Sequence, residues 1–170
     1  HTDYVPVPFD TRPDSIGHHG NAILVHKSVE VVAHDVLHLP TIEPRGAVLA
    51  DLKWKNRTVR IVGMHLDLSG LRRRQQVRSV LSQIDARAPH MPSILMGDLN
   101  EWSRQGGCLG EFVGRHHDCH TGPSFHSQRP MARLDRIFVS HDFHIRAAGT
   151  HHSLKARRAS DHLPVWAELS

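Results

Sequence analysis

The sequence predicts a single α/β domain, and three observations support this fold class. Short apolar or alternating runs typical of β-strands fill residues 21–68 and return over residues 133–169. Between them, residues 70–88 have the apolar spacing of an amphipathic helix. The chain has 170 residues, 39% of them hydrophobic, which is enough for one core and too few for two comfortable domains. We therefore treat residues 1–170 as one domain.

The first half of the chain predicts four strands followed by the helix. After an irregular, proline-containing lead-in, we expect strands over residues 21–27, 29–39, 46–55 and 58–68. The last two flank the polar stretch "KNR", which predicts a hairpin. The helix of residues 70–88 ends before Pro89, and one apolar stripe is expected to face the core. Its members are Leu71, Val77, Val80, Leu81 and Ile84.

The second half contains a buried strand, a long loop region and three closing strands. The run "PSILMGDLN" ends in polar groups, which is typical of a buried strand whose last side chains lie at the edge of a functional site. Residues 101–133 are interpreted as loop-rich, with at most a short helix around "GCLGEFV". Closing strands are expected over residues 133–140, 143–151 and 163–169, with "LKARRASDH" as a connection. The segment "CLGEFVGRHHDCH" lacks the ligand spacing of a common zinc module, so we interpret it as a polar loop.

Composition limits the function classes. The net charge of +4 and the pI of about 9.6 favour anionic partners. No stretch reaches the roughly 20 apolar residues of a transmembrane helix. Two cysteines cannot form a disulfide framework, which favours reduced thiols and the cytoplasm, although a secreted mature form is compatible with the sequence.

Four segments share one design, in which a predicted strand begins or ends at a compact polar cluster. They are "GMHLD", "MGDLN", "RLDRIF" and "SDHLPV". Residues i and i+2 of a strand point to the same side, so Asp98 and Asn100 can converge on one ligand. The candidate site residues are His65, Asp98, Asn100, Asp135, Asp161 and His162.

This set of side chains suits metal-assisted hydrolysis of a phosphoester. Hard oxygen ligands such as that of Asp161 suit Mg²⁺ or Mn²⁺, which neutralise phosphate charge. A histidine backed by an acid can take a proton from water, and we expect His162 and Asp135 to form that pair. Asn100 could donate a hydrogen bond to a phosphoryl oxygen as its negative charge grows.

The ordered segments "GNAILV", "GMHLDL", "ILMGDLN", "RLDRIFVS" and "SDHLPV" resemble the endonuclease/exonuclease/phosphatase superfamily, which has the DNase I-like fold. The resemblance spans roughly residues 17–169. It implies a four-layer sandwich of two mixed β-sheets flanked by helices, with the site at one end.

The resemblance also implies roles for single residues. His162 would be the acid–base histidine and Asp135 its orienting acid. His65 would bind or protonate phosphate, and Asp98 and Asn100 would position water and a phosphoryl oxygen or hold a second metal. Asp161 would help to bind the principal metal.

The sequence departs from the family pattern at its start. Nothing before "HTDYVPVPFD" matches the usual strand, helix and second strand, whose final glutamate is the chief metal ligand. By this comparison we expect the domain to be N-terminally incomplete. An unpaired sheet edge could then support self-association.

Several residues keep two interpretations. Asn21 could contact substrate or simply occupy a turn, and Asp67 is expected to be a loop acid. Asp135 could pair with Arg133 or Arg136 instead of a histidine. Three basic residues lead into the predicted site and could guide a phosphate substrate, although solvated loop charge is the alternative. They are Lys155, Arg157 and Arg158.

The leading hypothesis is a divalent-metal-dependent hydrolase of phosphoesters, with phosphodiesters the preferred bond class and nucleic acid the favoured substrate. The alternatives are a phospholipid head-group or inositol-phosphate hydrolase, and a noncatalytic module that binds phosphate or nucleic acid because it lacks the glutamate ligand.

Overall fold

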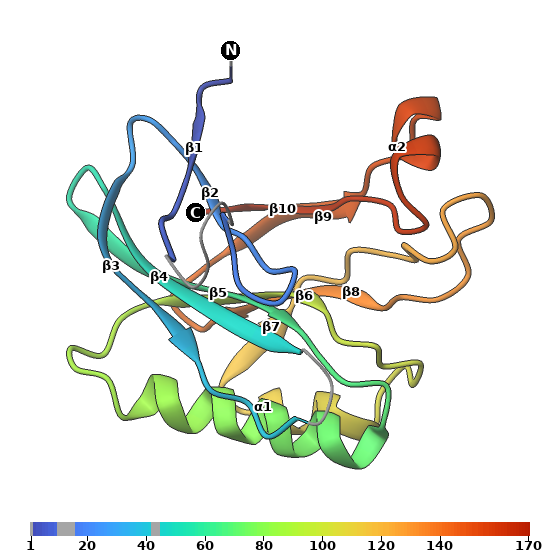
Figure 1. The fold of residues 1–170 in the computed structure, drawn as a ribbon, viewed down its shortest axis with the longest axis horizontal. Helices are drawn as coiled ribbons and strands as arrows, with labels where there is room; N and C mark the ends of the chain where they lie inside the picture. Colours follow the sequence, from blue (N-terminus) through green and yellow to red (C-terminus); the bar gives the residue numbers. More distant parts are fainter. Residues whose placement is uncertain (1, 10–15, 42–44) are drawn as a thin grey trace.

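A six-stranded mixed sheet forms the centre of the molecule (Figure 1). The computed structural model describes residues 2–9, 16–41 and 45–170. In spatial order the sheet contains β3 (Glu30–Leu37), β4 (Gly46–Trp54), β5 (Arg57–His65), β6 (Ser93–Asp98), β8 (Asp135–Ser140) and β7 (His116–Asp118). β5 and β6 pair in parallel, whereas the other neighbouring pairs are antiparallel.

The predicted hairpin between β4 and β5 is confirmed. Trp54 pairs with Arg57, and Lys55 takes the positive φ of 55° that a tight connection requires. β4 is buried from Gly46 to Leu52 because sheet neighbours flank it and other elements cover both of its faces. Its one acid, Asp51, is paired with the buried Arg60 of β5.

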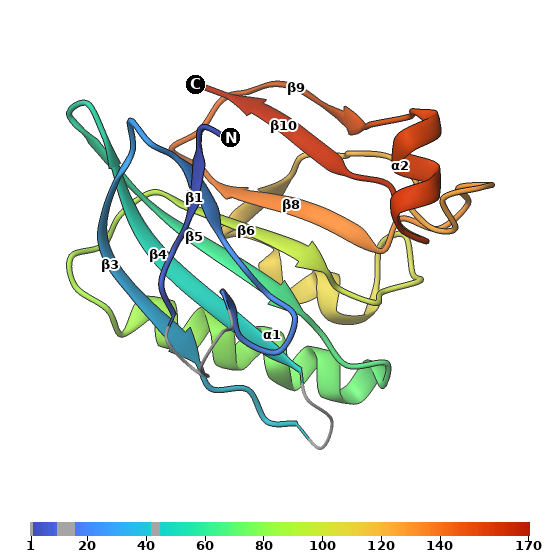
Figure 2. The same cartoon turned by 45° about the horizontal axis from the view of Figure 1, so that its top comes forward.

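Helix α1 (Gly70–Asp85) makes the crossover between the parallel strands β5 and β6 and covers one face of the sheet (Figures 1 and 2). Four of the five predicted stripe residues are buried, but the prediction for Leu71 is wrong, since 70% of its surface is exposed. Near the start of the helix, polar Arg73 and Gln76 occupy the inward face instead and bond the preceding loop.

The opposite face of the sheet carries two short antiparallel sheets (Figures 1 and 2). One pairs β1 (Tyr4–Pro6) with β2 (Leu24–His26), and the other pairs β9 (Ile145–Thr150) with β10 (Val165–Leu169). Val7, Val25 and Val48 belong to the core under the first pair, and Ile137 and Val139 to the core under the second. The α/β sandwich class is therefore confirmed, with a helix layer, the large mixed sheet and a second β layer made of two strand pairs.

Three elements differ from the expected pattern. The predicted connection over residues 154–162 contains a helix, α2 (Leu154–Ala159), whose N-terminal turn is capped by the hydroxyl of Ser153. The predicted polar loop contains β7, and the lead-in that was expected to be irregular contains β1. The short helix expected around "GCLGEFV" is present as the 3₁₀ turn η1 (Gly107–Phe112). Neither of the α-helices in the described part of the chain has the length and apolar character that crossing a membrane requires.

Candidate active site

Three of the predicted site residues occupy one row across the central sheet. Asp98, at the end of β6, is the register partner of His65, at the end of β5, and of Asp135, at the start of β8. Register partners lie side by side and project from the same face, so strand pairing alone brings a histidine and two acids together. This alignment results from one parallel and one antiparallel pairing.

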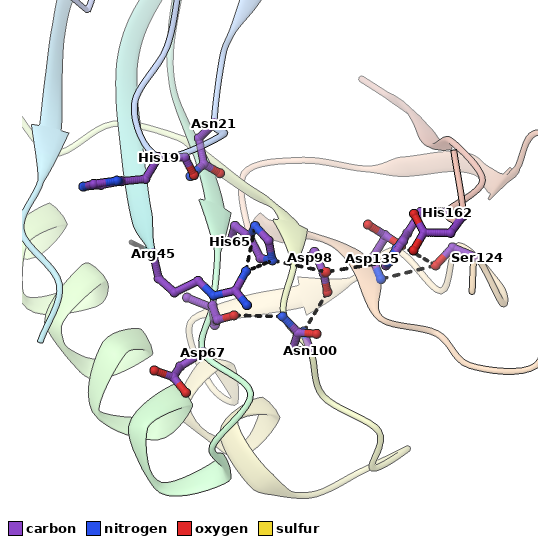
Figure 3. Close-up of polar contacts among 12 residues, drawn as sticks. His19, Asn21, Arg45, His65, Asp67, Asp98, Asn100, Ser124, Asp135 and His162 are labelled. Atoms are coloured by element: carbon purple, nitrogen blue, oxygen red, sulfur yellow. Dashed lines mark hydrogen bonds and ion pairs between the residues drawn. The ribbon is translucent and has the colours of Figure 1, made fainter. Parts of the chain in front are cut away.

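His162 joins this row from the loop between α2 and β10. Its Nδ1 donates a hydrogen bond to Oδ2 of Asp135 over 2.6 Å, and the Ser124 hydroxyl donates to the same oxygen over 2.5 Å (Figure 3). The alternative pairing of Asp135 with its arginine neighbours is wrong, because Arg133 and Arg136 both pair with Asp118. A proton held on Nδ1 leaves Nε2 as the basic nitrogen of a neutral ring.

Both imidazoles face one carboxylate oxygen. Oδ2 of Asp98 lies 3.6 Å from Nε2 of His65 and 3.9 Å from Nε2 of His162. These three side chains are partly exposed, so solvent reaches the space between them. The arrangement leaves a basic nitrogen, a second imidazole and an acid around one small volume.

The two histidines have opposite electrostatic settings. Burial lowers the pKa of His162, but the hydrogen bond to Asp135 and the charges of Asp135 and Asp98 outweigh burial, so its pKa lies above the ordinary value. The pKa of His65 is lowered by burial and by the adjacent Arg45 guanidinium, despite the attraction of Asp98. The surroundings therefore favour the neutral form of His65 and the protonated form of His162.

Asn100 is fixed in an unusual backbone conformation beside the row. Its φ is 49°, its backbone N–H donates to Oδ1 of Asp98 over 2.8 Å, and Nδ2 donates to the Leu66 carbonyl over 2.8 Å. Asparagine tolerates this left-handed region better than most residues because its short amide bonds locally. The side chain is buried, and its oxygen points away from the Leu66 carbonyl (Figure 3).

The loop that follows Asn100 is held by a buried ion pair that the sequence did not predict. The Glu101 carboxylate accepts from the backbone N–H of Ser103 and of Cys108, and Arg73 of α1 lies 3.4 Å away. Arg73 also donates to the carbonyls of Asp67 and Leu68. This pair ties the loop after β5 to the loop after β6.

Two further contacts at the site also escaped prediction. Nη1 of Arg45, directly before β4, contacts both ring nitrogens of His65 and lies 3.2 Å from Nδ1. Ser124 comes from the long loop region and donates to the same Asp135 oxygen that His162 contacts. Neither residue stands next to a predicted strand-end acid, so no local signal marked them.

The remaining predicted residues lie around this centre. Asn21 donates from Nδ2 to the carbonyls of His18, His19 and Gly46, which favours the turn interpretation, while substrate contact stays a prediction. Asp67 accepts from the N–H of Ser69 and behaves as the expected loop acid. Asp161 stands at the exposed rim, next to His162 in the chain, where its charge helps to raise the histidine pKa.

The three predicted basic residues lie on α2. Lys155 and Arg158 are exposed, and Arg157 is partly buried. The Arg157 carbonyl accepts from the hydroxyl of Ser127 and from Nε2 of Gln128, which fastens α2 to the loop carrying Ser124. The helix therefore sits against the rim of the site, and guidance of phosphate by these charges stays a prediction.

The predicted metal ligands carry oxygen donors, the type of ligand that a hard divalent cation prefers. Within the described residues, no group of three or more His, Cys, Asp or Glu side chains is arranged to hold a metal ion. The predicted ligands are two acids, Asp98 and Asp161, with the amide of Asn100. Mg²⁺ in phosphate-processing sites commonly uses one or two carboxylates and completes its shell with water and substrate.

Comparisons with known proteins agree with this architecture. A curated relative, the uncharacterized protein YbhP of Escherichia coli strain K12, is 28% identical over 164 residues, covering 90% of this chain and 63% of YbhP. The chain therefore spans under two thirds of the length of this relative.

Solved structures share the fold at low sequence identity. Danio rerio TDP2 complexed with a single-strand DNA product has a TM-score of 0.77 at 17% identity, covering 99% of this chain and 77% of that one. A mannosyl-6-phosphatase of Bacteroides thetaiotaomicron has a TM-score of 0.71 at 23% identity, covering 88% and 70%.

The family assignment comes from the sequence itself. The profile of the "Endonuclease/Exonuclease/phosphatase family" matches residues 1–162, nearly the whole chain. This match includes all of the strand ends that form the histidine and carboxylate row. The chain belongs to the Endonuclease/Exonuclease/phosphatase family.

Proposed function

We propose that the domain hydrolyses phosphodiesters with the help of a divalent metal ion, Mg²⁺ or Mn²⁺. The observation that carries this proposal is the position of His162, whose Nδ1 is bonded to Asp135 while its Nε2 faces Asp98. Family membership supports phosphoester chemistry.

His162 would act as the general base toward water. The 2.6 Å bond to Asp135 fixes the ring orientation and favours the tautomer with the proton on Nδ1. After Nε2 takes a proton from water, the imidazolium is stabilised by the same carboxylate. The hydroxyl of Ser124 donates a second hydrogen bond to the same carboxylate oxygen, which further restrains Asp135.

His65 and Arg45 would bind the phosphoryl group. A phosphodiester carries negative charge on its non-bridging oxygens, and that charge is concentrated in the transition state. The guanidinium of Arg45 supplies a permanent positive charge next to the neutral imidazole of His65. Together they would stabilise the oxygens that face away from the attacking water.

Asp98, Asn100 and Asp161 would hold the metal ion. Because Nδ2 of Asn100 is bonded to Leu66, the amide is oriented to offer its oxygen rather than its nitrogen. This geometry favours the ligand role over the expected donation of a hydrogen bond to a phosphoryl oxygen. A bound Mg²⁺ would polarise the phosphoryl oxygen and stabilise the leaving oxygen.

Nucleic acid is the substrate class that we favour. The net charge of +4 and the basic side chains of α2 beside the site suit a polyanion better than an isolated phosphate monoester. The fold relative with a bound single-strand DNA product is compatible with this choice. Phospholipid head groups and inositol phosphates are the alternative substrates for the same site.

The direct test measures hydrolysis of bis(4-nitrophenyl) phosphate with Mg²⁺ or Mn²⁺. We expect His162→Ala to lower kcat/KM by about 10²–10⁴-fold, the usual contribution of a general base. The exposed His144 lies before β9, away from the site, so His144→Ala is the matched control. Equal rates for wild type and His162→Ala would remove His162 from the chemistry. An inactive wild type that still binds phosphate esters would instead favour the noncatalytic module.

A further inference from the structure

Three aromatic rings lie in contact in a series that ends at the proposed general base. The ring centroids of Trp102 and Phe125 are 5.9 Å apart with an interplanar angle of 83°, and those of Phe125 and His162 are 5.0 Å apart at 49°. These are the separations at which aromatic pairs attract each other. The series therefore begins at the molecular surface and leads to the imidazole that faces Asp98.

Phe125 is held by backbone pairing on two sides. Its N–H donates to the carbonyl of Ala132, and its own carbonyl accepts from the N–H of Ala132. It also forms a β-bridge with His162. The ring is thus preorganised next to the imidazole, and a ligand that packs on it would gain affinity without first ordering this loop.

Trp102 is exposed although the chain on both sides of it is anchored. The preceding Glu101 is fixed by Cys108 and Arg73, and the Ser103 carbonyl accepts from the buried Arg136. The indole nevertheless leaves 65% of its surface in solvent. A single exposed apolar residue is ordinary, but an exposed indole between two anchored residues, in contact with a second ring at a proposed active site, has the character of a binding surface.

Positive charge lies beside the aromatic pair. The loop residues directly after Phe125 bond the carbonyl of Arg157 through Ser127 and Gln128. Arg157 and Arg158 form the last turn of α2, which leads into Asp161 and His162. A ligand that stacks on the two rings would thus have cations within reach of further phosphate groups.

We propose that Trp102 and Phe125 form a stacking subsite for an unpaired nucleobase of the phosphodiester substrate. This proposal rests on the proposed function and specifies its substrate class. A nucleobase has a π-face that stacks on any aromatic side chain, and its backbone carries the phosphates that the α2 charges suit. An acyl chain would gain most from an enclosed apolar cavity, whereas the indole of Trp102 is exposed and stands perpendicular to the ring of the partly buried Phe125.

The first test compares two esters that differ by one base. One is the 4-nitrophenyl ester of thymidine 5′-phosphate, and the other is the same ester of base-free deoxyribose 5-phosphate. For wild type we expect kcat/KM to favour the base-containing ester by at least about fivefold, the lower limit of base–aromatic stacking. The ratio of the two kcat/KM values should fall toward one in Trp102→Ala and should be partly kept in Trp102→Phe.

The control is Trp54→Ala, another exposed indole at the opposite end of β4 from the site row. It should keep the wild-type ratio. If wild type shows no base preference, or if Trp102→Ala keeps the full preference, the stacking subsite is disproved.

A second measurement separates this inference from the proposed catalysis. Binding of a fluorescein-labelled hexathymidylate is compared with an abasic oligomer of equal charge by anisotropy, in a buffer with EDTA so that no metal-dependent cleavage occurs. We expect wild type to bind the thymidylate at least about fivefold more tightly and Trp102→Ala to bind both equally. Equal binding of the two oligomers by wild type would overturn the subsite. Failure of wild type to cleave either ester would overturn the proposed function alone. The stacking subsite would then be judged from the anisotropy measurement.

Discussion

Replacing Asp135 by asparagine tests how far the histidine–carboxylate pair controls the site. The carboxylate accepts hydrogen bonds from Nδ1 of His162 at 2.6 Å and from the hydroxyl of Ser124 at 2.5 Å. Asparagine keeps the size of the side chain but removes its charge. A hydrogen bond between charged partners contributes about 1.5–3 kcal/mol, and we expect the lower end because a quarter of the His162 side chain is exposed.

The effect on stability should depend on pH with a defined sign. Burial lowers the pKa of His162, but Asp135 and the nearby acids raise it above the ordinary value. A raised pKa in the folded state means that the charged ring stabilises the fold below the ordinary pKa of about 6.5. This stabilisation disappears as the pH rises through the folded-state pKa. Asp135→Asn should therefore lose more stability at pH 5 than at pH 9.

Urea denaturation in EDTA at both pH values measures this difference, with Asp3→Asn as the control because Asp3 is an exposed acid paired with Lys27. In the hydrolysis assay, the acidic limb of the kcat/KM profile should move to lower pH in Asp135→Asn, since the imidazole loses its partner. The rate should fall by about 10²–10⁴-fold. If the acidic limb is unchanged and the stability loss is equal at both pH values, the charge of Asp135 does not control the protonation of His162.

Three further substitutions test the framework by urea denaturation. Glu101→Gln should cost about 1–3 kcal/mol because it weakens a buried, fully bonded carboxylate, and a loss below 0.5 kcal/mol would contradict this role. Gly97→Ala should destabilise by about 3 kcal/mol, since the glycine has a φ of 139° and an added Cβ would stand 1.9 Å from the Met64 carbonyl oxygen. A neutral result there would disprove the close approach. Arg60→Ala should cost about 3–5 kcal/mol because it leaves the buried Asp51 unpaired, and additional replacement of Asp51 by alanine should recover part of the loss.

The sequence predicted the large sheet well because its strands are apolar and end at distinct polar groups. β4 and β6 were located from runs whose burial requires an extended interior strand. The short elements were missed for a physical reason. β7 has three residues and α2 has six, too few to show a period, and α2 carries arginines where an amphipathic stripe would have apolar residues.

The members of the site row could be predicted, but their contacts could not. Each acid or histidine stood at a strand end, which is a local property. The pairing of Asp98 with both His65 and Asp135 depends on strand order and register, which no single segment encodes. The supporting residues Arg45 and Ser124 come from segments without periodicity, so only the folded chain shows that they reach the histidines.

The alignment of Asp98 with Asp135 by direct strand pairing has an evolutionary consequence. The long intervening segment leaves β6 and returns at β8, so insertions or deletions within it need not disturb the distance between the two acids. That distance is set by the roughly 4.8 Å spacing of neighbouring strands, a constant of β structure. Descendants of this domain could thus change their ligand preference through the segment between β6 and β8 while keeping the two acids in place.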